Sequence, residues 1–482
     1  MKYLNKSIIE INKLLKEKKI KPIDLVEEAF DNIEKNKELN CYITLNKEEA
    51  MNTAKELENK EVDNILFGLP IAVKDNIITK DLRTTCGSHI LDNFIPIYDS
   101  TIVEKLKEKH MIIIGKTNMD EFAMGSSSRT SFFGAPKNPW NKEKICGGSS
   151  GGSAGTIAAR DVLFALGSDT GGSIRQPASY TGIVGMKPTY GRISRYGLVA
   201  FASSLDQIGP MTKNVYENAI LLNAIVGKDE KDLTSADKKE EDFTRLIGED
   251  IKEMKIAVPN FLIGDIVSKE VKDKIKETIK LLEKNGATVD YVDVKYLDHS
   301  MTLYQIIAMA EASSNLARFD GIRYGFQAEN VKNINDLYLE TRAQGFGEEV
   351  KRRIMVGSYL LSGENAKIYY NKALSIRDDM RKELKNVFKD YDLIIGPTTV
   401  TTAYDLSDPM NDPRKSFMDD VLVIPVNMAG LPGMNIPVGF DQNHMPIGMQ
   451  IIGDSFEEAK MYKLASFIEK ELDLDLTPGG EK

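Results

Sequence analysis

The chain is poor in the side chains on which many enzyme sites depend, with four histidines, three cysteines and one tryptophan among 482 residues. The cysteines, Cys41, Cys86 and Cys146, are odd in number and widely separated. Such spacing predicts neither a disulfide framework nor a zinc motif. We therefore expect a protein of the reducing cytoplasm whose chain binds no metal ion.

Long apolar runs are also missing. A membrane helix needs about 18 or more consecutive apolar residues. The closest candidate, residues 421–440, is interrupted by three prolines and three glycines. The N-terminal residues lead into a charged amphipathic segment rather than into the apolar core of a secretory signal. These absences argue against contact with a membrane.

The chain has fewer basic than acidic residues: 63 lysines and arginines and 72 aspartates and glutamates, which gives a net charge of −9. The basic residues form no long stripe along the sequence. Proteins bind nucleic-acid phosphates mainly through lysine and arginine side chains. The chain is therefore predicted to be a poor principal binder of RNA. A partner would have to hold any RNA substrate.

The chain does contain enough apolar residues for a large core, 42% of the total, in alternating α and β patterns. Strands at 255–259 and 288–294, on either side of a helix with apolar residues at helical spacing from 271 to 282 and closed by Gly286, predict a βαβ unit, which implies parallel strands with helices on both faces. The length allows one or two domains. An amphipathic helix is expected at 21–36 within an N-terminal helical segment (1–60), buried strands at 66–73, 111–114 and 162–166, and a mainly helical segment at 298–390.

Residues 147–178 are the most informative stretch: a Gly/Ser loop, an apolar spacer, and a second Gly-rich turn that carries Ser173. Closely spaced small residues let backbone N–H groups crowd around a ligand and adopt positive φ values. Ser149 and Ser173 therefore stand where the main chain can bind an oxyanion, which predicts acyl-transfer chemistry. The alternative is a flexible linker. The spacer at 162–166 argues against a linker, because it is typical of a buried strand.

Two other motifs fit the chain only in part. Residues 147–151 match the G-x-S-x-G elbow of α/β-hydrolases, but that elbow follows a strand and needs a later histidine. Here the preceding residues are polar, and His299 and His444 lie in unpatterned contexts. Residues 115–117 end like a phosphate-binding loop, yet His110 stands where its first glycine should be. Neither motif is predicted to function.

Without a usable histidine, the best candidate for a base is Lys74, which ends an apolar run and precedes a polar turn. A lysine has a pKa of about 10.4 in water, and burial can lower that pKa until the amine accepts a proton at neutral pH. Ser–Lys pairs replace the histidine triad in some hydrolytic enzymes. The alternative is a strand-end lysine whose amine reaches solvent.

Residues 147–178 resemble the signature of the amidase signature family, and residues 68–76 resemble its lysine motif. The resemblance implies a Ser–Ser–Lys triad. Ser173 would be the nucleophile, Ser149 the bridging serine held by a cis peptide bond, and Lys74 the base. The fold implied is a single α/β/α domain over 1–482, with a large mixed central sheet covered by helices on both faces.

The same resemblance assigns the residues around the triad. The oxyanion hole would consist of backbone N–H groups in the second Gly-rich turn. Polar neighbours of the two serines are expected either to support the triad or to cap ordinary turns, and these readings stay equally open. The oxyanion residues are Thr170, Gly171, Gly172 and Ser173, and the supporting candidates are Ser150, Asp169 and Arg175.

Segments at 310–321, 349–355 and 420–433 resemble the branch of this family that hydrolyses glutamine within tRNA-dependent amidotransferases. The residues that match its glutamine site are Tyr304, Arg353 and Asp420. A guanidinium suits the α-carboxylate of glutamine, a carboxylate suits its α-ammonium group, and a tyrosine hydroxyl can orient either. Taken without the resemblance, these three would be a core tyrosine, a solvated helix arginine and a helix cap.

The resemblance also implies a division of labour within a heterotrimer. This chain would release ammonia from glutamine with no metal or organic cofactor of its own. Its B subunit would activate Glu-tRNA(Gln) with ATP and Mg²⁺, and a small C subunit would complete the assembly. Two alternatives stay open: a stand-alone amidase of the same family, and a non-catalytic scaffold. The presence of Lys74, Ser149 and Ser173 argues against a scaffold.

Overall fold

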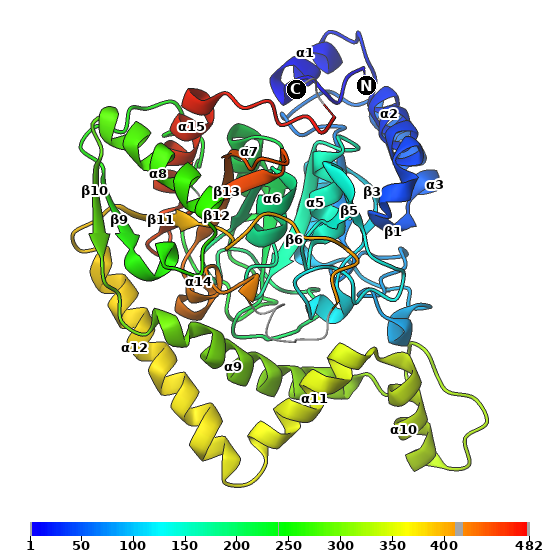
Figure 1. Cartoon of the computed structure of the whole chain (residues 1–482). Helices are drawn as coiled ribbons and strands as arrows, with labels where there is room; N and C mark the ends of the chain where they lie inside the picture. The colour runs from blue at the N-terminus through cyan, green and yellow to red at the C-terminus, as the bar shows by residue number, and fades with distance from the viewer. Residues whose placement is uncertain (1, 240, 410–417, 480–482) are drawn as a thin grey trace.

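An eleven-stranded mixed β-sheet forms the centre of the protein (Figure 1). The computed structural model describes residues 2–239, 241–409 and 418–479. Strands that are distant in the sequence are neighbours in this one sheet, as Met186 and Met434 show. In spatial order the strands are β1 (Tyr42–Leu45), β3 (Ile112–Thr117), β2 (Pro70–Lys74), β6 (Phe164–Asp169), β8 (Gln207–Thr212), β7 (Val184–Lys187), β12 (Gly433–Phe440), β13 (Pro446–Gly453), β11 (Leu393–Pro397), β9 (Lys255–Pro259) and β10 (Thr288–Val292).

The sheet has two parallel blocks with antiparallel strands between them. Strands β3, β2 and β6 run parallel, as do β11, β9 and β10. The pairs from β6 through β8, β7, β12 and β13 to β11 are antiparallel, and so is the edge pair of β1 and β3. The predicted mixed sheet is confirmed, and so is the parallel pairing of β9 and β10 around one helix.

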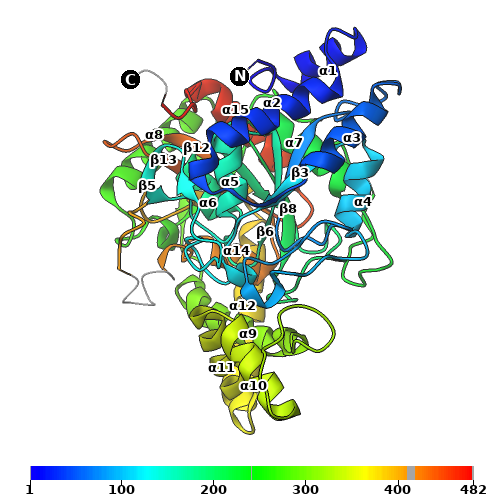
Figure 2. The same cartoon turned by 90° about the vertical axis from the view of Figure 1, so that its right-hand side faces the viewer.

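Helices cover both faces of the sheet (Figures 1 and 2). A side chain at Gly448 of β13 would contact Ser179, whereas one at Gly453, on the other face of the strand, would contact Met461. The α-helices are α1 (Ile8–Lys16), α2 (Pro22–Lys35), α3 (Lys47–Leu57), α4 (Thr101–Glu108), α5 (Gly151–Ala158), α6 (Arg175–Thr181), α7 (Val215–Ile225), α8 (Lys269–Lys284), α9 (Ser300–Asn315), α10 (Ile334–Gly345), α11 (Glu348–Leu361), α12 (Lys372–Val387), α14 (Ile424–Ala429) and α15 (Glu458–Leu472).

Several strand boundaries differ from those expected from the sequence. The strand predicted at 66–73 begins only at Pro70, because a turn with Gly68 at φ +71° precedes it. The strand predicted at 162–166 is β6, which continues to Asp169 because β8 pairs with its small and polar residues. Strand β3 likewise extends to Thr117, and β10 ends at Val292. Local hydrophobicity located the strands, and pairing partners set their ends.

The carboxyl ends of β2 and β6 meet at one edge of the sheet. Both strands are buried along their whole length. Their parallel register places Val73 beside Leu166. Lys74, the last residue of β2, therefore lies beside the end of β6 and the turn that follows it.

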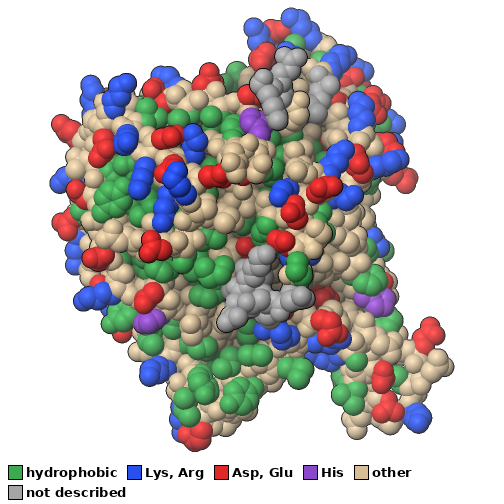
Figure 3. Space-filling view, viewed as in Figure 1, with side chains coloured by type: hydrophobic (Ala, Val, Ile, Leu, Met, Phe, Trp, Pro, Cys, Tyr) green, Lys and Arg blue, Asp and Glu red, His purple; other side chains and the backbone are tan. Residues whose placement is uncertain are grey.

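The predicted helical segment at 298–390 is confirmed as an arm built mainly from α9 to α12, which lies below the sheet on the side opposite α1 and α15 (Figures 1 and 2). Apolar side chains are exposed on this arm, and a green patch marks its lower tip (Figure 3). We call four of them the arm patch: Met355, Tyr359, Ile368 and Tyr369. Met355 is 72% exposed and Tyr359 is 59% exposed.

None of the helices within the described ranges combines the length and the apolar character that crossing a bilayer requires.

Candidate active site

The two Gly/Ser turns lie in direct contact. The first turn precedes α5 and contains a cis peptide bond between Gly148 and Ser149, as the family resemblance implied. The second precedes α6 and carries Ser173. The Ser150 N–H donates to the Ser173 carbonyl at 3.2 Å, and the Ser150 hydroxyl donates to the carbonyl of Ser168, in β6, at 3.1 Å. All of these residues are buried, so the turns are parts of the core and not a flexible linker.

Lys74 reaches both serines of the first turn. Its Nζ lies 2.7 Å from Ser149 Oγ and 2.8 Å from Ser150 Oγ, and it also donates to the Ser168 carbonyl at 3.2 Å. The side chain is 0% exposed, which rules out a strand-end lysine that reaches solvent. Burial lowers the pKa of Lys74 to about 7, although the carboxylates of Asp120 and Asp169 act against that shift. Near neutral pH the amine is therefore able to accept a proton from Ser149.

The second turn presents a hydroxyl and backbone donors without partners. Within the described ranges, the Ser173 hydroxyl and the N–H groups of Thr170, Gly171 and Ser173 form no hydrogen bond. The N–H of Gly172 differs from the expectation, because it already donates to Asp169 Oδ1 at 2.8 Å. The predicted oxyanion hole therefore has three available donors instead of four.

Asp169 and Arg175 stabilise this turn through an ion pair and hydrogen bonds. Arg175 Nε lies 3.0 Å from Asp169 Oδ2, and the same carboxylate accepts the N–H groups of Gly172 and Ile174. Burial opposes ionisation of Asp169, but the adjacent guanidinium outweighs it, so the pKa of Asp169 lies well below its usual range. Of the two readings left open, these contacts favour support of the triad over simple turn capping. Asn427, which the sequence did not indicate, adds a bond to Asp169 Oδ1 at 2.7 Å.

Tyr304 lies against the nucleophile turn. It belongs to α9 and is 8% exposed. A Cβ atom added to Gly171 would stand 2.7–2.8 Å from the Tyr304 ring, which leaves room for glycine alone. The tyrosine is therefore both packed in the core and placed at the edge of the site.

Arg353 is the one buried residue of its basic run. Its side chain is 6% exposed, against 33% for Lys351 and 36% for Arg352. Glu349, one turn earlier on α11, accepts from Arg353 Nε at 2.7 Å. The guanidinium carbon lies 5.5 Å from the centre of the Phe201 ring. A solvated helix face is therefore wrong for Arg353, while it describes its two neighbours.

Asp420 also lies against the turn that carries Ser173. A Cβ atom at Gly172, whose φ is +127°, would lie 2.9 Å from Asp420 Oδ1. That oxygen is buried and has no hydrogen-bond partner within the described ranges. Burial raises the pKa of Asp420 well above its usual value, and the charge of Asp419 adds to the effect. Its backbone carbonyl, not its side chain, accepts from Val423 and Ile424 where α14 begins.

An unpaired buried carboxylate is costly unless a cation meets it. Of the three predicted glutamine residues, Tyr304 and Asp420 therefore lie against the turn that carries Ser173, and Arg353 lies near enough to Tyr304 for its charge to act on the tyrosine. Asp420 has an acceptor left for an ammonium group. In the described ranges no group of three or more His, Cys, Asp and Glu residues is arranged to hold a metal ion.

Two further residues that the sequence analysis did not single out support the first turn. Gln176 Oε1 accepts the N–H of Gly148 at 3.0 Å, and the N–H of Asp120 donates to the Ser149 carbonyl at 3.2 Å. Both contacts hold the cis segment in place from elements far along the chain. Their spacing to the serines follows no local pattern, so only the folded chain reveals them.

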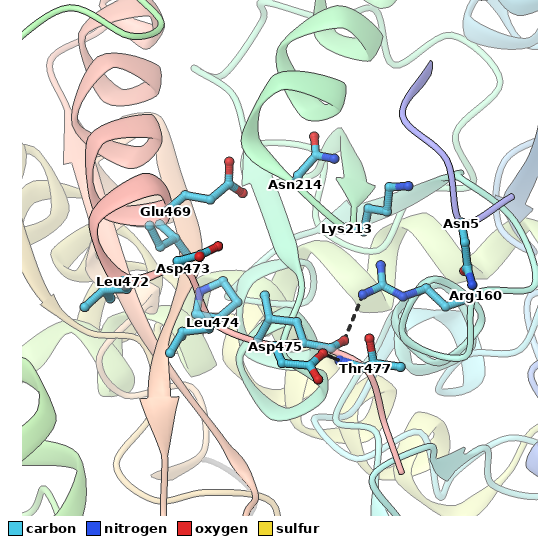
Figure 4. Close-up of a pocket in the computed structure, with 13 residues that line it drawn as sticks. Asn5, Arg160, Lys213, Asn214, Glu469, Leu472, Asp473, Leu474, Asp475 and Thr477 are labelled. Carbon is cyan, nitrogen blue, oxygen red and sulfur yellow. Dashed lines mark hydrogen bonds between the residues drawn. The ribbon is translucent and has the colours of Figure 1, made fainter. Parts of the chain in front are cut away.

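A separate cavity of about 460 Å³ lies between the C-terminal segment and the start of α7 (Figure 4). Arg160, Lys213 and Glu469 line it, and Arg160 donates to the Leu476 carbonyl at 2.8 Å. It contains none of the predicted catalytic or glutamine-binding residues. We therefore place the active site at the two serine turns.

Comparison with known proteins shows the family of the chain. The sequence profile of the family described as Amidase matches residues 24–461. The A subunit of glutamyl-tRNA(Gln) amidotransferase from Pediococcus pentosaceus is 52% identical over 472 residues, 97% of each chain, and that from Bacillus cytotoxicus is 51% identical over 477 residues, 98% of each chain. The crystal structure of the A subunit of glutamyl-tRNA(Gln) amidotransferase from Thermotoga maritima, 41% identical, superposes with a TM-score of 0.82 and covers 98% of this chain and 95% of its own. The chain belongs to the amidase family.

Proposed function

We propose that this chain is the glutamine-hydrolysing A subunit of a glutamyl-tRNA(Gln) amidotransferase, and that its ammonia converts Glu-tRNA(Gln) to Gln-tRNA(Gln). The observation that carries the proposal is the buried hydrogen bond between Lys74 and Ser149, beside the Ser173 turn, whose glycines lie against Tyr304 and Asp420. Relatives that bear this name match the chain over 97% or more of their length at 51–52% identity.

In the proposed reaction, neutral Lys74 accepts the proton of Ser149, and Ser149 accepts that of Ser173 as its oxygen attacks the side-chain amide carbon of glutamine. The N–H groups of Thr170, Gly171 and Ser173 bind the oxyanion that forms. The relay then returns a proton to the leaving ammonia. Water attacks the glutamyl ester with help from the same base, and glutamate departs.

Free glutamine fits the charges around this turn. Arg353, held by Glu349, would pair with the α-carboxylate, and Asp420 would pair with the α-ammonium group. Tyr304 stands beside both, since the charges of Arg353 and Asp420 each act on its hydroxyl. An amide without an ammonium group would leave the buried Asp420 carboxylate without a cation, which is unfavourable.

The chain is one component of an amidotransferase that has several subunits, as its relatives' names indicate. We propose the B and C subunits as its partners in the cytoplasm, with ATP and Mg²⁺ used by the B subunit to activate Glu-tRNA(Gln). Exposed apolar surface often marks a protein interface. The arm patch is of this kind, which supports a chain that works in an assembly. The net charge of −9 favours a partner as the main holder of tRNA.

The direct test is glutamine hydrolysis by the purified chain, alone and with the B and C subunits, ATP and Glu-tRNA(Gln). We expect strong stimulation by the full set and amidated tRNA as the product. High activity that the additions leave unchanged would mean a stand-alone amidase. No activity in any mixture would indicate a scaffold.

Arg353→Ala should impair the use of glutamine while sparing the use of ammonia. The loss of a charged pair to the α-carboxylate is expected to lower kcat/KM for glutamine by about 10- to 100-fold, mainly through KM. Ammonia added directly bypasses this subsite. The measurement is tRNA amidation by the assembled enzyme with each nitrogen donor.

The matched control is Arg352→Ala, on the same helix and paired with the same glutamate, but with a side chain 36% exposed. It should stay within about twofold of the wild type, since exposed ion pairs contribute little. Equal losses with glutamine and with ammonia in Arg353→Ala would contradict a glutamine-binding role.

A further inference from the structure

Asp206 is a buried carboxylate that the proposed reaction does not use. It directly precedes β8 and is 3% exposed. Its Oδ1 accepts the Thr170 hydroxyl at 2.7 Å, and its Oδ2 accepts the N–H of Phe201 at 2.9 Å. The N–H of Ala202 reaches both oxygens, at 3.2 and 3.1 Å. Two of these contacts reach residues that border the active site, Thr170 and Phe201.

The first contact fixes one end of the oxyanion turn. Residues 170–173 include two adjacent glycines, which have the freest backbone of any residue. Asp169 holds the far end through the N–H groups of Gly172 and Ile174. Asp206 holds the near end through the hydroxyl of Thr170. Two carboxylates therefore clamp a turn that would otherwise be loose, and oxyanion donors act only when they are held in place.

The second contact fixes the support of Arg353. The Phe201 ring is 1% exposed and lies 5.5 Å from the Arg353 guanidinium carbon. The backbone of Phe201 is held on one side by Asp206 and on the other by Asn315, whose Nδ2 donates to the Phe201 carbonyl at 3.1 Å. A shift of Phe201 would therefore move the surface against which Arg353 packs.

Asp206 differs from Asp169 in its electrostatic setting. Asp169 is neutralised by Arg175, whereas Asp206 has no ion-pair partner in the part of the chain that the structure describes. Burial raises the pKa of Asp206 to about 6, and its hydrogen bonds and the charge of Arg195 act against that shift. Near neutral pH the carboxylate is therefore ionised and accepts all of its bonds. A buried carboxylate is costly unless it is hydrogen-bonded, and the bonds that satisfy Asp206 also fix the groups that donate them.

We infer that Asp206 is a positioning residue, which holds the oxyanion donor at Thr170 and the Phe201 support of Arg353 with one carboxylate. Asp206 therefore links two effects: the binding of the α-carboxylate of glutamine by Arg353, and the stabilisation of the oxyanion by the N–H of Thr170. The inference rests on the proposed function. The contact of Asp206 with Thr170 can be tested separately from its contact with Phe201.

The test is steady-state glutamine hydrolysis by the assembled enzyme with Asp206→Asn, Thr170→Val and Thr170→Ser. Asp206→Asn disturbs the contacts with both Thr170 and Phe201. We therefore expect kcat to fall and KM to rise, each by about fivefold or more. Thr170→Val removes only the hydroxyl and should lower kcat while KM stays near wild type. Thr170→Ser keeps the hydroxyl and should restore kcat.

The matched control is Asp161→Asn. Asp161 is also buried, burial likewise raises its pKa to about 6, and it is hydrogen-bonded to Asn36 and Thr156 away from the serine turns. It should leave both kinetic constants within about twofold of wild type. A comparable change in Asp161→Asn would mean that any buried carboxylate matters, and would overturn the inference.

Other results of the same experiment also test the positioning role of Asp206. Wild-type kcat and KM in a folded Asp206→Asn would overturn the inference. If that variant fails to fold, the Thr170 pair decides: an unchanged kcat in Thr170→Val overturns it, and a loss restored by serine supports it. Ammonia-dependent amidation should persist in every folded variant. A wild-type enzyme without glutaminase activity would instead defeat the proposed function itself.

Discussion

Replacement of Ser173 by alanine is expected to abolish glutamine hydrolysis, with a loss of roughly 10⁴- to 10⁶-fold in kcat. The hydroxyl is the one nucleophile placed beside three free backbone donors, and alanine leaves no atom to form the glutamyl ester. Folding should not change, because the hydroxyl has no hydrogen-bond partner within the described ranges that would be lost. The measurement is glutamate release by the assembled enzyme, together with amidation driven by added ammonia.

Ser179→Ala is the matched control for this substitution. Ser179 is a buried serine on α6, the helix that follows the nucleophile turn, and its hydroxyl pairs with that of Thr399 at 3.2 Å. It should keep most of the glutaminase activity. Ammonia-dependent amidation should survive in both variants. Substantial glutamine hydrolysis by Ser173→Ala would show that another group is the nucleophile.

Lys74→Met should lower kcat for glutamine by about 10²- to 10⁴-fold, the range that general acid–base catalysis supplies. Methionine fills similar space in the core but accepts no proton from Ser149, so the relay to Ser173 stops at its first step. KM should change little, because no predicted contact to glutamine is removed. The experiment is the full kinetics of glutamine hydrolysis at a fixed pH above 7.

Lys187→Met is a demanding control. Burial lowers the pKa of Lys187 to about 7 as well, yet its Nζ donates to the carbonyl of Pro188 and reaches neither serine. This variant should keep kcat within a few-fold of the wild type. In the wild-type enzyme, kcat should fall as the pH drops below about 7, since a protonated Lys74 is no longer a base. A kcat that is independent of pH between 5 and 9 would contradict Lys74 as the base.

The comparison of buried lysines shows how far a sequence can lead. Lys74, Lys116 and Lys187 all end or lie within apolar strands, and all are buried with lowered pKa values. Their local sequences alone do not rank them. Only Lys74 contacts two serines, because parallel pairing of β2 with β6 brings its strand end to the turns. Recognition of a family motif singled out the lysine that contacts Ser149 and Ser150, which periodicity alone could not do.

Arg353 makes the same point for the substrate site. Within one basic run, helix periodicity allows any of three residues to face inward, and the packing of α11 against α9 decides that Arg353 does. Asp206 and Asn427 were not anticipated, since each contacts the nucleophile turn from more than 30 positions away. A single chain carries no local pattern for such contacts.

The amino-acid sequence alone determined the two serine turns, the alternation of strands and helices and the absence of a histidine base. Each of these depends on residues that are neighbours along the chain, such as small residues that permit a tight turn. Tertiary structure decided the protonation of Lys74, the burial of Arg353 and the unpaired oxygen of Asp420. The physical reason is that desolvation and charge are sums over groups from distant segments, and no stretch of sequence contains those groups together.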